Sequence, residues 1–270
     1  MFTIGIDIGS SASKCVVLAD GKEIKGAALN AAGLGSADIS DTIYIALKKA
    51  GIVIDNIAVS AVTGYGRNGW RSEDTSVIRV SELTCHAYGA VHIFPETRTV
   101  IDIGGQDSKS ISIDGKGRMN GFLMNDKCAA GTGRFLEVMT RILGVSFGEF
   151  DKLALSAESP VEISNTCTVF AESEVISRLA AGTPRADIAS GVCSSIASRV
   201  GSLAKRGQVN PAICISGGVS NISSIRKAIG RVLESEILYS PLAQYFGALG
   251  AAIYAHEKIN VSKKQEGQNG

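Results

Sequence analysis

Two segments of the chain share one template, in which an acidic residue, a glycine, small polar residues and a lysine follow in order. Each reads Asp-Ile-Gly, three further residues and Ser-Lys, at Asp7 to Lys14 and again at Asp102 to Lys109. Apolar residues precede each segment and alternate along the chain after it, which predicts a β-hairpin in both places. A loop of this composition offers backbone N–H groups and hydroxyls to an anion. The template therefore predicts two phosphate-binding loops, on two duplicated domains that face each other across one nucleotide.

The positions that we expect to contact phosphate are Gly9, Ser10, Ser11, Ala12, Ser13 and Lys14 in the first segment and Gly104, Gly105, Gln106 and Asp107 in the second. Both lysines could instead be solvated turn residues. The duplication favours a place near phosphate for Lys14, while a structural role stays open for Lys109.

A third candidate element follows the predicted strand 212–216. This strand ends at Gly217, Gly218 and Val219, and a helix is predicted over 223–233. Paired glycines let the backbone approach a ligand closely, and a strand end before a helix is a common place for nucleotides. A tight turn is the simpler interpretation of two glycines. Because two predicted phosphate loops precede these glycines, we interpret the glycines as the binding surface for a purine ring or ribose.

The six cysteines fall into two groups. Four lie in apolar or helical stretches and are interpreted as buried core residues: Cys15, Cys85, Cys193 and Cys214. Cys128 lies in a polar loop of small residues before a predicted helix, and Cys167 lies among cap-type residues where another helix begins. Free backbone N–H groups and the helix dipole stabilise a thiolate at such places.

Cys128 and Cys167 are too few for a complete metal site. Iron–sulfur cubanes and structural zinc commonly take four thiolates. A two-fold symmetric homodimer would bring two pairs together on its axis. Two unpaired thiols are the alternative.

Composition bounds the function class. The chain has 270 residues, 45% of them hydrophobic, with five prolines and a net charge of +1 from 27 basic and 26 acidic residues. This balance predicts neither a nucleic-acid partner nor a membrane partner. No signal-like segment is evident at the N-terminus, so we expect a cytoplasmic protein, where cysteines stay reduced. We expect an N-terminal domain over 1–97, a C-terminal domain over 98–259 and a flexible tail over 260–270.

Several elements are predicted from apolar periodicity and caps. The expected strands after the first hairpin include 57–62 and 212–216, and the expected helices are 41–50, 81–91, 131–143, 168–181, 187–205, 223–233 and 247–258. Ser40 is the expected cap of the first helix and Gly51 its end. The last helix could pack back on the first domain.

Five motifs together resemble one known family. They are Asp7-Ile8-Gly9-Ser10-Ser11-Ala12-Ser13-Lys14, Ile101-Asp102-Ile103-Gly104-Gly105-Gln106-Asp107, the segment Asn125 to Phe135, the segment Thr166 to Glu174, and Ser240-Pro241-Leu242-Ala243-Gln244-Tyr245. The chain is similar to the activators of 2-hydroxyacyl-CoA dehydratases. These belong to the BadF/BadG/BcrA/BcrD-type ATPase family, which also serves benzoyl-CoA reductase and double-cubane-cluster reductases.

The resemblance implies an α/β fold of two duplicated RNase H-like domains, of the actin, heat-shock chaperone and sugar kinase superfold, with a nucleotide cleft between them. It also implies a homodimer with one bridging [4Fe-4S] cluster, whose ligands would be Cys128 and Cys167. Gln244 joins the candidate nucleotide residues. Such a protein passes one low-potential electron per cycle from ferredoxin or flavodoxin to an iron–sulfur client enzyme.

A mechanism follows if both sites work together. Asp7 and Asp102 are placed to reach Mg²⁺ through water, and Gln106 to orient the water that attacks ATP. We expect the nucleotide, ATP or ADP, to set the angle between the domains and so to change how the dimer presents its cluster. Hydrolysis would then gate electron transfer.

Two other functions are compatible with parts of the sequence. A small-metabolite kinase of the same superfold would need an acceptor pocket, and would have no use for paired cysteines at helix starts. A nucleotide-sensing dimer could hold zinc with the same four thiolates. Metal analysis separates zinc from iron.

Overall fold

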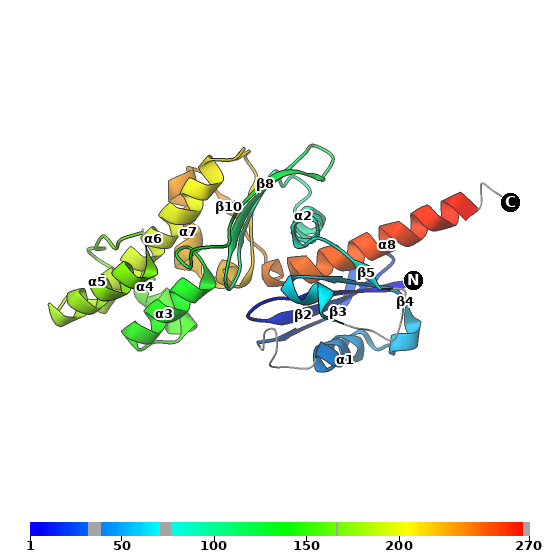
Figure 1. The fold of residues 1–270 in the computed structure, drawn as a ribbon, viewed down its shortest axis with the longest axis horizontal. Coiled ribbons are helices and arrows are strands. Elements are labelled where there is room, and N and C mark those ends of the chain that lie inside the picture. Colours follow the sequence, from blue (N-terminus) through cyan, green and yellow to red (C-terminus); the bar gives the residue numbers. More distant parts are fainter. Residues whose placement is uncertain (32–38, 71–76, 166, 267–270) are drawn as a thin grey trace. The chain divides into compact units, whose positions relative to one another are not determined.

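The computed structural model describes residues 1–31, 39–70, 77–165 and 167–266, with side chains described as far as residue 260. The chain divides into two compact units. Unit 1 comprises Met1–Pro95, Lys116–Met119 and Tyr245–Gly270, and unit 2 comprises Glu96–Gly115 and Asn120–Gln244. Each contains a five-stranded mixed sheet with helices (Figure 1).

The sheet of unit 1 has the strand order β3-β2-β1-β4-β5. Its elements are β1 (Phe2–Ile8), β2 (Ser13–Ala19), β3 (Glu23–Asn30), α1 (Ile39–Ala50), β4 (Ile57–Thr63), β5 (Ile78–Arg79), α2 (Glu82–Ile93) and α8 (Phe246–Glu266). Successive strand residues point to opposite faces. Val17 of β2 therefore packs in the cluster that includes Leu47 of α1, while Val16 packs with Leu249 of α8. Both faces of this sheet are covered by helices.

The sheet of unit 2 has the order β10-β9-β6-β7-β8. Its elements are β6 (Thr99–Ile103), β7 (Ser108–Ile113), β8 (Met119–Asn125), α3 (Gly133–Leu143), α4 (Phe147–Leu155), α5 (Thr168–Ala180), α6 (Arg185–Lys205), β9 (Ile213–Ser216), α7 (Ser223–Leu233) and β10 (Ile237–Leu238). The core contains Phe135 and Phe150 from the helices and Ile101 and Ile215 from the sheet. Helix α3 buries one side against this core and ends at Gly144, whose left-handed backbone (φ 61°) closes the helix.

The two units repeat one strand arrangement. In unit 1, β1 pairs antiparallel with β2 and parallel with β4. In unit 2, β6 pairs antiparallel with β7 and parallel with β9. A 3₁₀ helix follows the parallel strand in both, Tyr65–Asn68 after β4 and Gly218–Asn221 after β9. The expectation of duplicated α/β domains agrees with this repeat.

Most predicted helices form within two residues of their expected limits, but some predictions need correction. Ser40 lies inside α1, which begins at Ile39, so it is not the cap. Helix α4 was not predicted, although Ser146 and Glu149 form a capping box at its start. The tail expected over 260–270 is helical as far as Glu266, and residues 267–270 lie outside the described part.

The last helix belongs to unit 1. The sequence assigned residues 245–259 to the second domain and allowed the last helix to pack back on the first. These residues fall in the first unit together with the rest of α8, which agrees with that packing. The physical reason is burial, because Ala248, Leu249 and Ala252 of α8 pack against Val16 and Leu18 of β2. Within the described residues, no helix is long and apolar enough to cross a membrane, α8 included.

Candidate functional site

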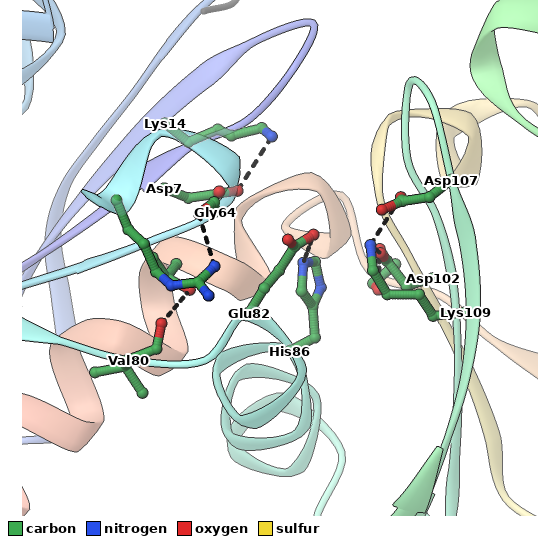
Figure 2. Close-up of polar contacts among 12 residues, drawn as sticks. Asp7, Lys14, Gly64, Val80, Glu82, His86, Asp102, Asp107 and Lys109 are labelled. Atoms are coloured by element: carbon green, nitrogen blue, oxygen red, sulfur yellow. Dashed lines mark hydrogen bonds and ion pairs between the residues drawn. The ribbon is translucent and has the colours of Figure 1, made fainter. Parts of the chain in front are cut away.

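The first predicted phosphate loop connects β1 to β2 in unit 1. Asp7 and Lys14 are direct partners in the strand register, and Lys14 Nζ lies 3.2 Å from Asp7 Oδ2 (Figure 2). Gly9 N donates to Ala12 O at 3.1 Å, which closes the four-residue loop. Ser11 is exposed at its tip, whereas the carboxylate of Asp7 is buried. The loop thus has a neutral ion pair at its base and hydroxyls at its tip.

The second predicted loop connects β6 to β7 in unit 2 and has the same register. Asp102 is opposite Lys109, and their Oδ2 and Nζ atoms lie 3.1 Å apart. Gly104 N donates to Asp107 O at 2.9 Å. Lys109 also pairs with Asp107 Oδ1 at 2.7 Å, as Figure 2 shows. Gln106 is exposed at the tip.

One carboxylate distinguishes the two loops. Asp107 occupies the position that corresponds to Ala12 in the first loop. Lys109 therefore shares its ammonium between two carboxylates, and all three side chains are at most 4% exposed. The base of the second loop carries an excess negative charge, which suits a hydrated cation, and that of the first loop carries none.

A glycine lies against the aspartate in both units. Gly64 follows β4 and Gly217 follows β9, and each has a φ of 85°, a conformation that residues with a Cβ rarely adopt. A methyl group on Gly64 would lie 2.5 Å from Asp7 Oδ1, and one on Gly217 would lie 2.9 Å from Asp102 Oδ1. Gly217 was predicted as a site residue. Gly64 was not predicted as a site residue, although the strand-then-glycine pattern occurs at both positions.

The third predicted element also assembles in unit 2. Gly218 is exposed at the end of β9, and a methyl group there would lie 3.6 Å from Gln244 Nε2. Gln244 Oε1 accepts a hydrogen bond from Asn221 Nδ2 at 2.9 Å. Val219 has a buried side chain that belongs to the core, so only its backbone is available to a ligand. The structure thus brings Gly217, Gly218 and Gln244 together.

Cys128 lies in the loop between β8 and α3 and is half-buried. Asn125 Nδ2 donates to Cys128 O at 2.9 Å and to Ala130 O at 3.3 Å. Thr132 donates to Ala129 O through its backbone N at 3.0 Å and its Oγ1 at 2.7 Å. The loop that carries this thiol is therefore internally hydrogen-bonded.

Cys167 is the N-cap residue of α5 and is also half-buried. Its neighbour Thr166 lies outside the described residues. The segment just before it is held by two helices: Ser164 N donates to Glu174 Oε2 of α5 at 2.9 Å, and Ser195 Oγ of α6 donates to Ser164 O at 3.0 Å. The hydroxyl Oγ1 of Thr168 is buried and has no hydrogen-bond partner among the described residues.

The other four cysteines are buried, as predicted. Burial raises the pKa of Cys85, Cys193 and Cys214 to about 12 and that of Cys15 further still. These thiols stay protonated at neutral pH and do not compete as ligands.

The BadF/BadG/BcrA/BcrD ATPase family matches residues 4–255 of the chain. The chain belongs to this family. The (R)-2-hydroxyglutaryl-CoA dehydratase activating ATPase of Acidaminococcus fermentans is 49% identical to it over 258 residues, which cover 96% of this chain and 98% of the relative. The 2-hydroxyisocaproyl-CoA dehydratase activator of Clostridioides difficile is 45% identical over 265 residues, 98% of both chains. One chain of the benzoyl-CoA reductase of Thauera aromatica is 30% identical over 271 residues, 95% of both chains.

Solved structures agree with this assignment. The activator of the 2-hydroxyisocaproyl-CoA dehydratase from Clostridium difficile, solved with bound ADPNP, superimposes with a TM-score of 0.93 over 98% of each chain at 45% identity. A ROK family glucokinase from Streptomyces griseus, 17% identical, has a TM-score of 0.57 over 95% of this chain and 100% of its own, which shows a common fold alone. The chain is thus an ATPase with the actin-like and sugar-kinase-like fold.

Some of the residues that contact the candidate site of this ATPase were not identified from the sequence. Ser216 Oγ donates to Asp102 Oδ1 at 2.8 Å, so a strand remote in sequence orients the candidate metal-side carboxylate. Next to Gln244, the Tyr239 hydroxyl donates to Asn221 Oδ1 at 3.2 Å, and the guanidinium of Arg226 lies 3.7 Å from the centre of the Tyr239 ring. No local motif marks these contacts, since their partners are distant in the chain.

One prediction about the cysteine loops is wrong. The first amides of α3 were expected to be free to stabilise the Cys128 thiolate. Gly133 N instead donates to Gly104 O, and Arg134 N donates to Gly105 O, both at 2.8 Å. The reason is that β6 ends beside the start of α3, so its loop carbonyls accept these hydrogen bonds first.

Proposed function

We propose that this ATPase activates an iron–sulfur client enzyme by coupling ATP hydrolysis to the transfer of one low-potential electron. The client would be a 2-hydroxyacyl-CoA dehydratase or a related double-cubane-cluster reductase, and ferredoxin or flavodoxin would supply the electron. The observation that carries the proposal is that the cysteines fall into two groups that differ in burial. Two half-buried thiols lie in one unit, Cys128 in the loop before α3 and Cys167 at the N-cap of α5, while the other four are buried and protonated.

The donor set fits half of a four-thiolate site. Cys128 and Cys167 supply two ligands of the kind that iron–sulfur clusters take, and the unpartnered hydroxyl of Thr168 lies next to Cys167 in the chain. A [4Fe-4S] cluster held by both thiols of two chains supplies one-electron redox chemistry when bound. The residues of this chain provide its ligands and fix the loops that present them.

A second copy of the chain would complete the ligand set. Apolar side chains are exposed near both cysteines in the sequence: Val169 (64%) and Phe170 (67%) follow Cys167, and Phe122 (49%) and Met124 (40%) precede Cys128. Exposed apolar side chains of this size favour a protein partner. This supports a two-fold symmetric homodimer in which each chain contributes the same two thiols.

The hairpin loops would hold the nucleotide. We assign phosphate contacts to the loop 9–14, which carries the hydroxyls of Ser10 and Ser11, and to the loop 104–107, which carries the exposed side chain of Gln106. Base or ribose contacts are assigned to Gly217, Gly218, the Val219 backbone and Gln244. Asp102, like Asp7, would reach Mg²⁺ through water, and the exposed Gln106 would orient the attacking water. Cytoplasmic reducing conditions would keep the thiols available.

The decisive experiment compares cysteine variants of the anaerobically purified protein. We expect a brown homodimer with four irons, because two thiols per chain require two chains to complete the site. Cys128→Ser and Cys167→Ser should each lose the iron while nucleotide binding is retained. Cys193→Ser is the matched control, because Cys193 is buried against the Ser224 hydroxyl and should keep its iron content.

Activation of a purified dehydratase by the reduced protein, with and without ATP, completes this test. Asp102→Asn should impair Mg²⁺-dependent hydrolysis without loss of iron. Zinc in place of iron would support the sensing dimer, and phosphorylation of a metabolite by a metal-free protein would support the kinase. A normal cluster in either cysteine variant would contradict the ligand assignment.

A further inference from the structure

The start of α3 is tied to the candidate phosphate loop of the same unit. The first amides of a helix have no acceptor within the helix. Here Gly133 N donates to Gly104 O and Arg134 N donates to Gly105 O, both at 2.8 Å. These two carbonyls belong to the loop that we assign to nucleotide phosphate. Gly104, Gly105 and Gly133 are half-buried, so water competes only in part for these hydrogen-bonding groups. The loop and the helix start therefore move together.

Gly133 has little free space beside the loop. A methyl group on this residue would lie 3.1 Å from Gly104 O and 3.3 Å from Gly105 Cα. Both contacts are tighter than ordinary van der Waals packing, so a side chain here would push the two backbones apart by a few tenths of an ångström. Nothing in the hairpin template itself required a glycine at this position, since it lies in a different segment of the chain.

The hydrogen-bonded connection between the loop 104–107 and the start of α3 continues directly into the Cys128 loop. Thr132, the residue before Gly133, is fully buried and holds Ala129 O through both its backbone N and its Oγ1. Asn125 bridges the carbonyls of Cys128 and Ala130 from the other side. The carbonyls of Cys128, Ala129 and Ala130 thus each accept a side-chain hydrogen bond. A displacement of the helix start is therefore passed to the thiol.

Arg199 of α6 extends the connection to the second cysteine segment. A methyl group on Gly131 would lie 3.0 Å from Arg199 Cγ, so the aliphatic stem packs against the Cys128 loop. Arg199 Nη1 also donates to Asn165 O at 3.4 Å, two residues before Cys167. One side chain thus contacts the segments that carry both candidate ligands.

We propose that Gly133 is a positioning residue that transmits the nucleotide state of the loop 104–107 to Cys128, with Arg199 as the link to the Cys167 segment. The inference rests on the proposed function, because it assumes that nucleotide phosphate contacts this loop. A γ-phosphate that shifts the Gly104 and Gly105 carbonyls by a fraction of an ångström displaces the amides that donate to them. Packed elements pass such shifts on because they cannot deform continuously.

Hydrogen exchange of the full-length protein tests the first step. Peptides that span residues 126–136 are followed by mass spectrometry with ADP and with a non-hydrolysable ATP analogue. In the unchanged protein, the exchange rates of the Gly133 and Arg134 amides should differ roughly fivefold or more between the two nucleotides, as for an ordinary allosteric coupling. Gly133→Ala should abolish this difference while nucleotide binding is retained. Gly148→Ala in α4 is the control, because no described atom lies within 4 Å of the added methyl group.

Alkylation of Cys128 tests the second step. Its rate in cluster-free, full-length protein should depend on the nucleotide, and Thr132→Val should remove that dependence while the amide response at Gly133 persists. If Gly133→Ala does not fold, Thr132→Val alone decides between the outcomes. A nucleotide-dependent rate that survives in both variants would overturn the inference.

These measurements need no cluster, so they separate the inference from the proposed function. A protein that binds ATP and shows nucleotide-dependent exchange and alkylation, but holds no iron, would contradict only the electron-transfer proposal. A brown, ATP-hydrolysing dimer with equal exchange and equal alkylation in both nucleotide states would contradict only the proposed role of Gly133.

Discussion

At the scale of single residues, the two loop lysines have different surroundings although they share one sequence template. Among the residues that the structure describes, Lys14 pairs with Asp7 alone, and its side chain is 13% exposed. Lys109 is 3% exposed and pairs with both Asp102 and Asp107. A buried cation between two carboxylates is costly to remove, because the carboxylates would stay in a low-dielectric interior without it. We infer that Lys109 chiefly stabilises its loop, whereas Lys14 is available to a phosphate.

Replacing each lysine by alanine should separate these roles. Lys109→Ala should lower the free energy of unfolding by about 3–5 kcal/mol, the usual cost of breaking a buried ion pair. Lys14→Ala should weaken ATP binding and lower stability by much less. Urea denaturation and nucleotide titration of both variants measure the two effects. Equal losses of stability would contradict the distinction.

The buried cysteines predict how stability depends on pH. Burial raises the pKa of Cys214 to about 12 from its ordinary value of 9.0. In the unfolded chain this thiol loses its proton near pH 9, while in the folded chain it keeps it. The folded state then binds more protons, so the stabilisation is complete below pH 9 and is lost as the pH rises toward 12.

Each such thiol should lower the free energy of unfolding by up to about 1.4 kcal/mol per pH unit above pH 9. Urea denaturation between pH 8 and pH 11 measures this slope. Cys214→Ala should flatten it, and an unchanged slope in this variant would contradict the cause that we assign.

At the scale of elements, α8 packs against its neighbours by direct backbone contact. A methyl group on Gly250 would overlap the carbonyl oxygen of Cys85 in α2, and one on Gly5 of β1 would overlap that of Ala248 in α8. A carbonyl group approaches another backbone this closely only where the facing residue has no Cβ. Glycine therefore sets the distance between α8 and the sheet of unit 1.

Gly250→Ala should lower the free energy of unfolding by about 1–3 kcal/mol, because the helix must shift to relieve the overlap. Gly148→Ala again serves as control, and thermal or urea denaturation of both variants measures the effect. Equal stability of the two variants would show that α8 accommodates the methyl group freely.

At the scale of the whole molecule, the chain leaves unit 1 and returns to it. Residues 245–270 belong with residues 1–95, although more than half of the sequence lies between them. Val16 and Leu18 of β2 would be exposed without α8, because Leu249 and Ala252 cover them. The first unit is therefore incomplete until the C-terminal helix has been synthesised.

A fragment of residues 1–95 should fail to melt cooperatively and should aggregate through the uncovered sheet face. Joining residues 245–266 to it through a flexible linker should restore a cooperative transition. Circular dichroism and size-exclusion chromatography of the two fragments measure this. Cooperative melting of residues 1–95 alone would show that α8 is dispensable for this unit.

The sequence by itself determined the features that depend on neighbours in the chain. The repeated template predicted both hairpins because Asp7 and Lys14, like Asp102 and Lys109, pair across a loop of four residues. Apolar context predicted the four buried cysteines, and cap residues predicted the starts of several helices. Local signals suffice for the hairpins and the helix starts, because the contacts that stabilise them lie within about ten residues. For the cysteines, an apolar neighbourhood in the sequence marks a strand or helix that the fold buries.

Only the tertiary structure decided the features that join remote segments. The sequence left open whether α8 packs in unit 1, and the hydrogen bond from Ser216 to Asp102 has no local signature. The same holds for the amide of Gly133, which is bound to Gly104 rather than free for Cys128. These contacts form because strands far apart in the sequence pair in one sheet and bring the ends of their loops together. Which remote strands pair is settled by burial of the whole chain, since no short segment carries that information.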